Sequence, residues 1–234
     1  MTGMAHPPAQ ERPRWRRALG SFWGQLLLAM VTFGLIISFV AKPYTVSSSS
    51  MEPTLRTGDR VLVDRVSYRF GEPAAGDVIV FEADENWDGP DRPEPSPLRA
   101  AWIWFGQWTG FGPSGEHTLV KRIIATPGQT VSCCSDDGRV VVDGLPTEEG
   151  YLGRDFDFSP GVLDCGTVPR SARCFDEVTV PERSYLVLGD HRANSSDSAT
   201  RCRTADAVPS CWRWALRKDI VGRSAVTFWP LNRG

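Results

Sequence analysis

An apolar segment near the N-terminus, residues 18–41, constrains the fold of this chain more than any other feature. It contains 24 residues without a charge, and as a helix it would extend roughly 36 Å, enough to cross the hydrocarbon core of a bilayer. A cleavable signal peptide usually has an apolar region of only about 7–15 residues, followed by small residues. Because this segment is longer and ends in Phe39-Val40-Ala41, it predicts an uncleaved transmembrane anchor.

The charges beside this segment predict its orientation. Four arginines and one glutamate precede it, at Arg12, Arg14, Arg16, Arg17 and Glu11, and only Lys42 follows it directly. Basic residues are enriched on the cytoplasmic side of membrane segments. We therefore expect a cytoplasmic basic tail at residues 1–17, a single plasma-membrane anchor at 18–41 and an extracytoplasmic domain at 42–234. The net charge of −2 gives no indication of nucleic-acid binding.

The domain after the anchor is predicted to be mainly β. No long amphipathic helical pattern occurs outside the anchor, whereas short β-branched runs separated by Gly and Pro recur along the chain. These runs lie at residues 60–66, 77–81, 119–125, 130–132, 139–144, 177–181, 184–188 and 219–230. The fold class indicated is an antiparallel β-sheet domain with a substantial core.

Residues 82–118 differ in composition and are predicted to be a loop-rich aromatic insertion. Acidic residues, Gly and Pro come first, and five large rings follow, at Trp102, Trp104, Phe105, Trp108 and Phe111. Such rings either lie at the headgroup level of a membrane or pack beneath a long loop, and the sequence favours neither. Gly110, Gly112 and Gly115 have the spacing of a dinucleotide-binding motif, but Pro113 interrupts it, so we interpret this stretch as a loop.

Six cysteines indicate disulfides, because an exported domain enters an oxidising compartment. They are Cys133, Cys134, Cys165, Cys174, Cys202 and Cys211. Equal eight-residue gaps favour Cys165–Cys174 and Cys202–Cys211. The adjacent Cys133 and Cys134 rarely bridge each other in proteins and could take partners from either loop. No C-x-x-C or histidine spacing is present, so we expect no metal site.

Three stretches contain the residue types of a hydrolytic site. A serine run at residues 47–50 ends in Ser-Met-Glu-Pro-Thr, Lys121 lies inside an apolar run, and residues 189–198 form a polar turn after another such run. A serine hydroxyl is a poor nucleophile until a base takes its proton. A lysine can be this base if burial lowers its pKa far below the usual value of about 10.4.

Histidine is the commoner base, but the chain contains only His6, His117 and His191, and no G-x-S-x-G elbow. A Ser-His-Asp triad would require His191, since His6 lies in the cytoplasmic tail and His117 lies beside the aromatic insertion. Side chains alternate along a strand, so only one of Lys121 and Arg122 points inward. A permanently charged arginine cannot accept the proton, so Lys121 is the candidate base if it is the residue that points inward. The alternative is a lysine on the solvated face of an edge strand.

These stretches resemble the type I signal peptidases, serine endopeptidases that use a Ser/Lys dyad. The resemblance rests on four groups of residues in the family's order. They are Ser50-Met51-x-Pro53-Thr54, Gly58 to Val63 with Gly76 to Phe81, Val120-Lys121-Arg122-Ile123, and Gly189-Asp190-x-Arg192-x-Asn194-Ser195-x-Asp197-Ser198. With the apolar segment in front of them, they cover most of the chain.

The resemblance implies a role for each matching residue. Ser50 would be the nucleophile and Lys121 the general base. The Ser50 backbone N–H and the Ser48 hydroxyl would stabilise the oxyanion, and Ser195 would orient the lysine. A structural charged cluster would comprise Asp190, Arg192 and Asp197. Three positions depart from the family: Ser49 stands where many relatives have glycine, Ala193 at a position often acidic, and Ala199 where arginine commonly follows Ser198.

The resemblance also implies the substrate and partners. The substrates would be signal peptides of exported preproteins, cut after a small-x-small motif such as Ala-x-Ala. The expected enzyme is a monomer in contact with membrane lipid and without a cofactor, and Met51 and Leu55 would lie against the membrane or the substrate groove. Two alternatives stay open: a maturation peptidase of the same clan with one dedicated substrate, and a noncatalytic membrane-anchored binding module.

Overall fold

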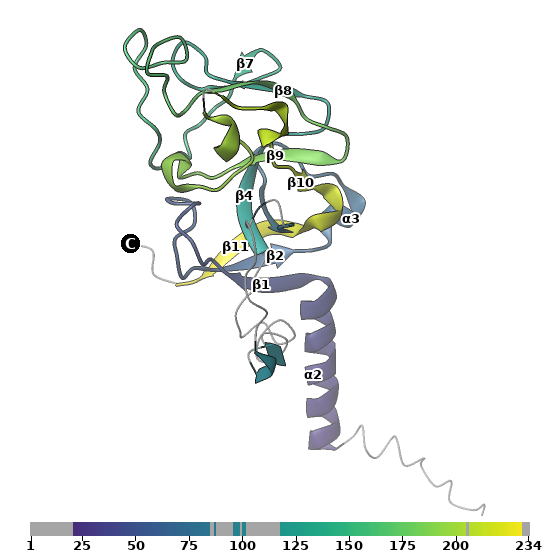
Figure 1. Cartoon of the computed structure of the whole chain (residues 1–234). Coiled ribbons are helices and arrows are strands. Elements are labelled where there is room, and N and C mark those ends of the chain that lie inside the picture. The colour runs from purple at the N-terminus through teal and green to yellow at the C-terminus, as the bar shows by residue number, and fades with distance from the viewer. Residues whose placement is uncertain are drawn as a thin grey trace, which may run out of the picture.

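A computed structural model of the chain describes residues 21–84, 87, 96–98, 100–101, 118–204 and 206–230. The predicted basic tail and most of the aromatic insertion, with its five rings and the glycines of the dinucleotide pattern, lie outside these residues. The described part contains two antiparallel sheets, one of seven strands and one of four. Figure 1 shows the four-stranded sheet at the end of the molecule far from the N-terminal helix.

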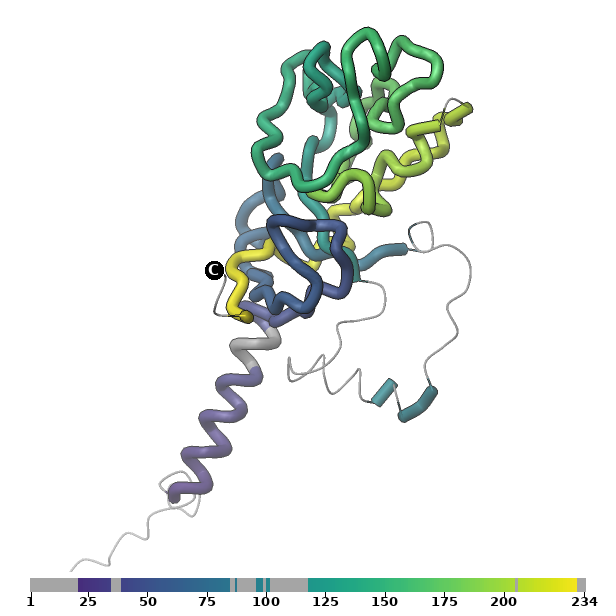
Figure 2. The backbone as a smooth tube through the Cα atoms, turned by 90° about the vertical axis from the view of Figure 1, so that its left-hand side faces the viewer, coloured from purple at the N-terminus to yellow at the C-terminus, as the bar shows by residue number. Residues whose placement is uncertain are grey.

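The N-terminal helix, α2, spans Phe22–Phe39 and has no acidic residue in its first turn and no basic residue in its last turn. It projects away from the sheets as a rod (Figure 2). By length and hydropathy, none of the helices within the described residues would cross a membrane. The chain passes directly from α2 into strand β1, Ala41–Thr45, so the last residue of the predicted anchor belongs to a strand.

The seven-stranded sheet has the order β1-β2-β11-β3-β4-β9-β10. Its further strands are β2 Arg60–Asp64, β3 Val78–Glu82, β4 Thr118–Ala125, β9 Ser184–Leu188, β10 Ala215–Leu216 and β11 Ile220–Trp229. All neighbours pair antiparallel. The last strand of the chain, β11, lies inside the sheet, between β2 and β3. All five residues of β9 are buried, because this strand is covered on both faces.

The four-stranded sheet has the order β7-β6-β5-β8. Its strands are β5 Thr130–Cys133, β6 Val140–Val142, β7 Leu145–Pro146 and β8 Phe175–Thr179. A turn that begins at Thr126 joins β4 to β5, and the Gln129 side chain accepts the Thr126 backbone N–H at 2.9 Å. One apolar cluster connects the two sheets, with Phe175 from β8 packed among side chains of β9.

The prediction of a mainly β, antiparallel domain is confirmed by these sheets. Each predicted strand overlaps an observed one, whereas β1, β7 and β10 were not predicted. Both β7 and β10 contain only two residues, too few for a pattern of alternation to appear. Strand β1 contains Pro43, and proline is confined to edge positions in sheets. Here β1 is indeed the edge strand beside β2.

Three disulfides are present. Cys165–Cys174 and Cys202–Cys211, with Cα atoms 5.5 and 5.2 Å apart, are the pairs that the sequence spacing favours. The adjacent Cys133 and Cys134 bridge each other, in contrast to the expectation that they would take partners from the loops. The other four cysteines are already joined in the two pairs within their loops. Cys133 and Cys134 therefore have only each other as partners.

Candidate active site

Ser50 is positioned by the short turn that follows β1. The residue is only 6% exposed, and its carbonyl accepts the His191 backbone N–H at 3.0 Å. The next side chain, Met51, and Leu55 pack into the core with Val61 and Val63. Both apolar side chains are therefore buried in the core beneath the turn, whereas the resemblance implied that they lie against the membrane or the substrate groove. Their burial fixes the turn and the direction in which the Ser50 hydroxyl points.

Lys121 lies in β4, opposite Ile79 of β3. Its residue is 3% exposed, and its Nζ donates a hydrogen bond to Ser50 Oγ at 2.6 Å. The sequence predicted that Ser50 and Lys121 act together although they lie 71 residues apart. In the structure the amine and the hydroxyl are in direct contact. The distance lies within the range for transfer of a proton between a nucleophile and its base.

Burial lowers the pKa of Lys121 from 10.5 to about 8, while the negative charges of Asp197 and Asp190 act in the opposite direction. Desolvation disfavours the charged form of an amine, and a nearby carboxylate favours it. Desolvation is the larger effect here. A substantial fraction of the amine is therefore neutral near pH 8, which a lysine on a solvated strand face would not be.

Two further serines lie close to Ser50. The Ser48 hydroxyl oxygen is 3.2 Å from Ser50 Oγ, and either oxygen can be the donor. Among the described residues, Ser195 Oγ is buried without a hydrogen-bond partner. Any side chain at Gly189 would collide with Ser195 Oγ and with the Ser50 carbonyl oxygen. Gly189 thus allows the polar turn to approach the nucleophile, and this close approach brings Ser195 to the site.

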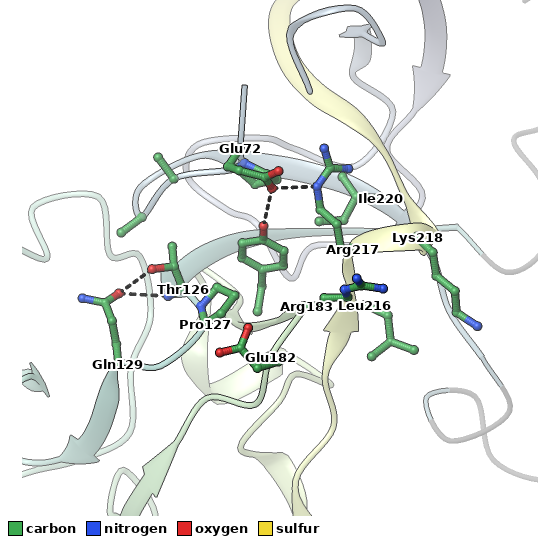
Figure 3. Close-up of a pocket in the computed structure, with 14 residues that line it drawn as sticks. Glu72, Thr126, Pro127, Gln129, Glu182, Arg183, Leu216, Arg217, Lys218 and Ile220 are labelled. Atoms are coloured by element: carbon green, nitrogen blue, oxygen red, sulfur yellow. Dashed lines mark hydrogen bonds and ion pairs between the residues drawn. The ribbon is translucent and has the colours of Figure 1, made fainter. Parts of the chain in front are cut away.

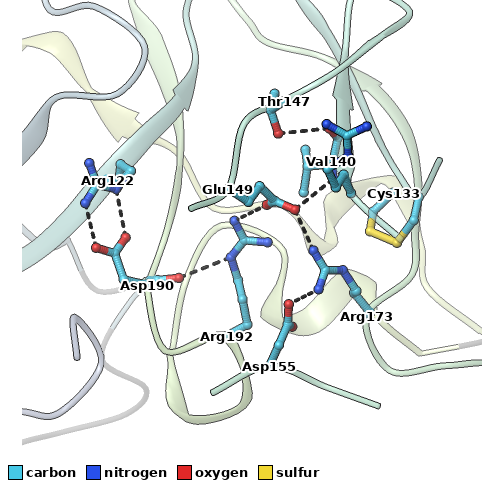
Figure 4. Close-up of polar contacts among 12 residues, drawn as sticks. Arg122, Cys133, Val140, Thr147, Glu149, Asp155, Arg173, Asp190 and Arg192 are labelled. Carbon is cyan, nitrogen blue, oxygen red and sulfur yellow. Dashed lines mark hydrogen bonds and ion pairs between the residues drawn. A yellow bond between two sulfur atoms is a disulfide. The ribbon is translucent and has the colours of Figure 1, made fainter. Parts of the chain in front are cut away.

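Arg122, the neighbour of Lys121, makes a two-pronged ion pair with Asp190. Its Nε and Nη2 donate to the two carboxylate oxygens at 2.8 and 2.6 Å, and its guanidinium lies 4.0 Å from the centre of the Tyr151 ring. Figure 4 shows this pair near the ion pairs that Glu149 makes with Arg173 and Arg192. As predicted, Lys121 and Arg122 point to opposite faces. Although Arg122 points away from Lys121, its partner Asp190 is buried. The ion pair holds the polar turn at residues 189–198 against β4.

The other two members of the predicted charged cluster have partners outside it. Arg192 Nη2 donates to Glu149 at 2.6 Å, and Glu149 also accepts from Arg173. Asp197 is fully buried, and Arg203 Nη2 lies 3.3 Å from its carboxylate. The structure therefore places Asp190, Arg192 and Asp197 in one turn, but each is paired with a different element of the chain.

The comparison with protein families matches residues 19–229 to the family described as "Signal peptidase, peptidase S26". The chain belongs to the signal peptidase family. A signal peptidase I from Mycobacterium tuberculosis (strain ATCC 25618 / H37Rv) is 37% identical over 234 residues, which cover 96% of this chain and 77% of that protein. A signal peptidase I from Leptolyngbya laminosa is 32% identical and covers 97% of this chain and 87% of its own length.

These relatives confirm the predicted enzyme class, signal peptidase I. Among solved structures, a crystal structure of a signal peptidase I from Enterococcus faecalis V583 has 23% identity and a TM-score of 0.35, and the match covers 66% of this chain and 98% of that one.

The sequence of this signal peptidase did not reveal Glu149 and Arg203 as partners of the charged cluster. Glu149 lies 43 residues before Arg192 in the chain, in a stretch without strand or helix. Arg203 is one of many arginines, and it lies six residues after Asp197 in a stretch that is not predicted to be a helix or a strand. Arg192, Arg201 and Arg203 all lie within six residues of Asp197, and the sequence does not show which of them pairs with it.

Neither alternative chemistry is supported by the arrangement of side chains. Nδ1 of His191 is buried without a partner among the described residues, and it is the backbone of His191 that contacts Ser50. The sulfur atoms of Cys134, Cys165 and Cys174 lie within 4.8 Å of one another. All three belong to disulfides, whereas a metal binds the thiolate form.

A separate pocket of about 1100 Å³ lies beside β9, β10 and the loop before β3. Its lining includes Glu72, which accepts hydrogen bonds from Tyr185 at 3.1 Å and from Arg217 at 2.9 Å (Figure 3). Neither Ser50 nor Lys121 lines this pocket. The hydrogen bonds of Glu72 occupy Tyr185 and Arg217, and among the described residues that line the pocket no hydroxyl lies beside a buried amine. The contact between Ser50 and Lys121 is therefore the stronger candidate for the active site.

Proposed function

We propose that the chain removes signal peptides from exported preproteins, with Ser50 as the nucleophile and Lys121 as the general base. The observation that carries this proposal is the 2.6 Å contact between Lys121 Nζ and Ser50 Oγ. Family membership supports a peptidase, and the buried amine is the group near the hydroxyl that can accept its proton. A lysine beside a serine has this use only when the amine is kept from water.

In the first step, Ser50 Oγ attacks the scissile carbonyl carbon while neutral Lys121 accepts the hydroxyl proton. The lysine then donates that proton to the departing amine, which leaves an acyl ester on Ser50. Water, deprotonated by the same amine, hydrolyses the ester. The Ser48 hydroxyl and the Ser50 backbone N–H would donate hydrogen bonds to the oxyanion, which needs donors that are already in place.

The remaining predicted residues would act as supports. Ser195 would hold the lysine in position, and its buried, unpartnered hydroxyl near Ser50 is consistent with this use. The ion pairs of Asp190, Arg192 and Asp197 would hold the polar turn against β4 and the turn of Ser50. None of these three needs to touch the substrate for this role.

The specificity and the membrane setting are part of the same proposal. We propose cleavage after small-x-small motifs such as Ala-x-Ala, by a monomer whose residues 18–41 form a plasma-membrane anchor. The tail at residues 1–17 would be cytoplasmic and the domain at 42–234 extracytoplasmic. The absence of charges in the segment supports an anchor, and so do the exposed apolar side chains of α2, such as Trp23 and Leu27. Signal peptides are themselves apolar, so a membrane would raise the local concentration of both.

The decisive test replaces each member of the pair. We expect Ser50→Ala and Lys121→Ala each to reduce cleavage of a preprotein with an Ala-x-Ala site by about 10⁴-fold or more. Ser47→Ala is the matched control, because Ser47 belongs to the same serine run but is exposed. Cleavage by this control should stay close to that of the unchanged chain. Folding of each variant is checked by circular dichroism.

The same experiment separates the alternatives. Residual cleavage at full rate by either variant would exclude the proposed pair. Cleavage of one preprotein among a broad set would indicate a maturation peptidase with a dedicated substrate. A folded chain that cleaves no preprotein at any pH would indicate a binding module.

The pH dependence gives a further prediction. Because the pKa of Lys121 is lowered to about 8 and only the neutral amine accepts a proton, kcat/KM should rise with pH and level off above about pH 8. The measurement is a pH–rate profile with a substrate that does not titrate in this range. A rate that is constant from pH 6 to 10 would contradict Lys121 as the base.

A further inference from the structure

Asp197 links the polar turn to the reacting groups. It is fully buried, and its carboxylate accepts the backbone N–H of Gly189 at 3.4 Å and that of Ala199 at 3.2 Å. Gly189 is the residue whose Cα lies against the Ser50 carbonyl and Ser195 Oγ. A displacement of Asp197 would therefore be passed on to the nucleophile's own turn.

Arg203 is held beside Asp197 from several sides. Its side chain is 8% exposed and its Nη2 lies 3.3 Å from Asp197 Oδ1. The guanidinium lies 4.9 Å from the centre of the Phe156 ring. The preceding residue, Cys202, is buried and bridged to Cys211. The guanidinium is packed on a ring, and the disulfide holds the backbone beside it. Arg203 therefore loses little conformational freedom when it pairs with the carboxylate.

The sequence around Asp197 has no nearer cation in the place where the family resemblance implies one. The position after Ser198 is Ala199, which is fully buried within the apolar cluster that joins the two sheets. The positive charge comes instead from four residues further along, on the short segment after the 3-10 helix at Thr200–Cys202.

We propose that Arg203 is a positioning residue for the proposed catalytic base Lys121, and that it acts through Asp197. It does so in two ways. It holds the carboxylate against Gly189, and it balances a negative charge that lies close enough to Lys121 to act on it. This inference rests on the proposed pair of Ser50 and Lys121.

The charges around the amine fix the sign of the effect. The carboxylates that act on Lys121 are those of Asp197 and Asp190, and both raise its pKa against the larger lowering by burial. Asp190 is balanced by Arg122, and Asp197 by Arg203. Arg192, paired with Glu149, is also near enough to act on Arg203.

Removal of the positive charge at Arg203 would leave Asp197 unbalanced. An unpaired carboxylate favours the protonated form of a nearby amine. The amine would then become neutral only at higher pH, and fewer molecules would hold a base that can accept the Ser50 proton at pH 7. A residue that only stabilises the fold would lower the rate at every pH without moving the profile.

The test compares pH profiles of kcat/KM for the full chain with a preprotein that contains an Ala-x-Ala site. We expect Arg203→Gln to move the rising limb upward by about one pH unit, so that the rate falls about tenfold at pH 7 and recovers above pH 9. Arg203→Met serves as a second uncharged variant, since its chain still covers the Phe156 ring. Arg203→Lys, which keeps the charge, should restore most of the original profile.

Arg201→Gln is the matched control, because Arg201 lies in the same segment but is exposed. Its profile should coincide with that of the unchanged chain. An unshifted profile for both uncharged variants would overturn the proposal, as would a failure of both to fold into an enzyme active at any pH. The proposed pair itself is judged separately, by Lys121→Ala. Loss of cleavage in that variant together with unshifted Arg203 profiles would reject only the role of Arg203.

Discussion

The two sheets of this molecule are stabilised in different ways. The seven-stranded sheet includes the two longest described strands, β4 with eight residues and β11 with ten. Side chains such as Ile79, Phe81 and Leu186 are fully buried in it, and no described cysteine lies in it. The four-stranded sheet has strands of two to five residues, and two disulfides lie in or beside it, Cys133–Cys134 and Cys165–Cys174. Short strands bury too little apolar surface to hold long loops, and cross-links supply the difference.

The position of the proposed active site follows from this difference. A lysine with a lowered pKa requires a dry environment that does not open, and the strands around Lys121 provide one. The four-stranded sheet shares one apolar cluster with β9, but it carries long loops and its edge strand β7 is exposed. We therefore expect changes in the first sheet to affect stability strongly, and changes in the second to affect it less.

The largest effect is expected in the seven-stranded sheet, at Phe81. This side chain is fully buried and packs edge to face against Trp87, with ring centres 5.1 Å apart. Phe81→Ala should reduce the free energy of unfolding by about 3–5 kcal/mol, because it leaves a cavity in a closely packed core. Urea unfolding followed by tryptophan fluorescence measures this change.

The contrasting change in the four-stranded sheet is Leu145→Ala in the edge strand β7, at a residue that is 72% exposed. We expect this variant to change the free energy of unfolding by less than about 0.5 kcal/mol. Equal losses for the two variants would show that the exposed edge of the four-stranded sheet matters as much to stability as the buried centre of the seven-stranded sheet.

The next effect is the loss of folding stability that results from burying the Lys121 amine. Burial lowers the pKa of Lys121 from 10.5 to about 8, so below pH 8 the fold carries a penalty of about 3 kcal/mol for the charged form. The unfolded chain binds more protons than the folded chain between these two values, so stability rises with pH in this range. Lys121→Met should therefore be more stable than the unchanged chain by about 3 kcal/mol at pH 7.

This gain should shrink as the pH is raised from 8 to 10.5, because the amine of the unchanged chain loses its proton in the folded state. Urea titrations of both chains at pH 7 and pH 10 check this. A gain that is the same at both pH values would show that the amine is not desolvated in the folded protein.

A smaller loss than that of Phe81→Ala is expected when a disulfide beside the four-stranded sheet is removed. Replacement of Cys165 and Cys174 together by alanine removes a cross-link over nine residues and should cost about 2–3 kcal/mol. Because the contact of Ser50 with Lys121 lies in the other sheet, cleavage at 25 °C should stay within about twofold. A loss of cleavage in a variant that remains folded would show that the two sheets are coupled more closely than their cores suggest.

Much of the fold and the pair at its centre could be predicted from the sequence. The apolar and β-branched residues of Ser184–Leu188 predict a buried strand. The apolar residues on both sides of Lys121 indicate that this lysine can be buried. The short strands β7 and β10 could not be predicted, because two residues carry no periodicity. Residues 102–117 lie outside the described part of the chain, so the two readings of their rings stay open.

The sequence by itself determined the chemistry of the residues at the site: a hydroxyl, an amine in apolar surroundings and a set of opposite charges, in the order of a peptidase family. The tertiary structure decided which of them meet. It brought Lys121 to 2.6 Å from Ser50 and gave Asp197 its cation from Arg203. Contact and desolvation depend on the packing of strands that are distant in the chain. The distances between their side chains cannot be inferred from the order of the residues alone.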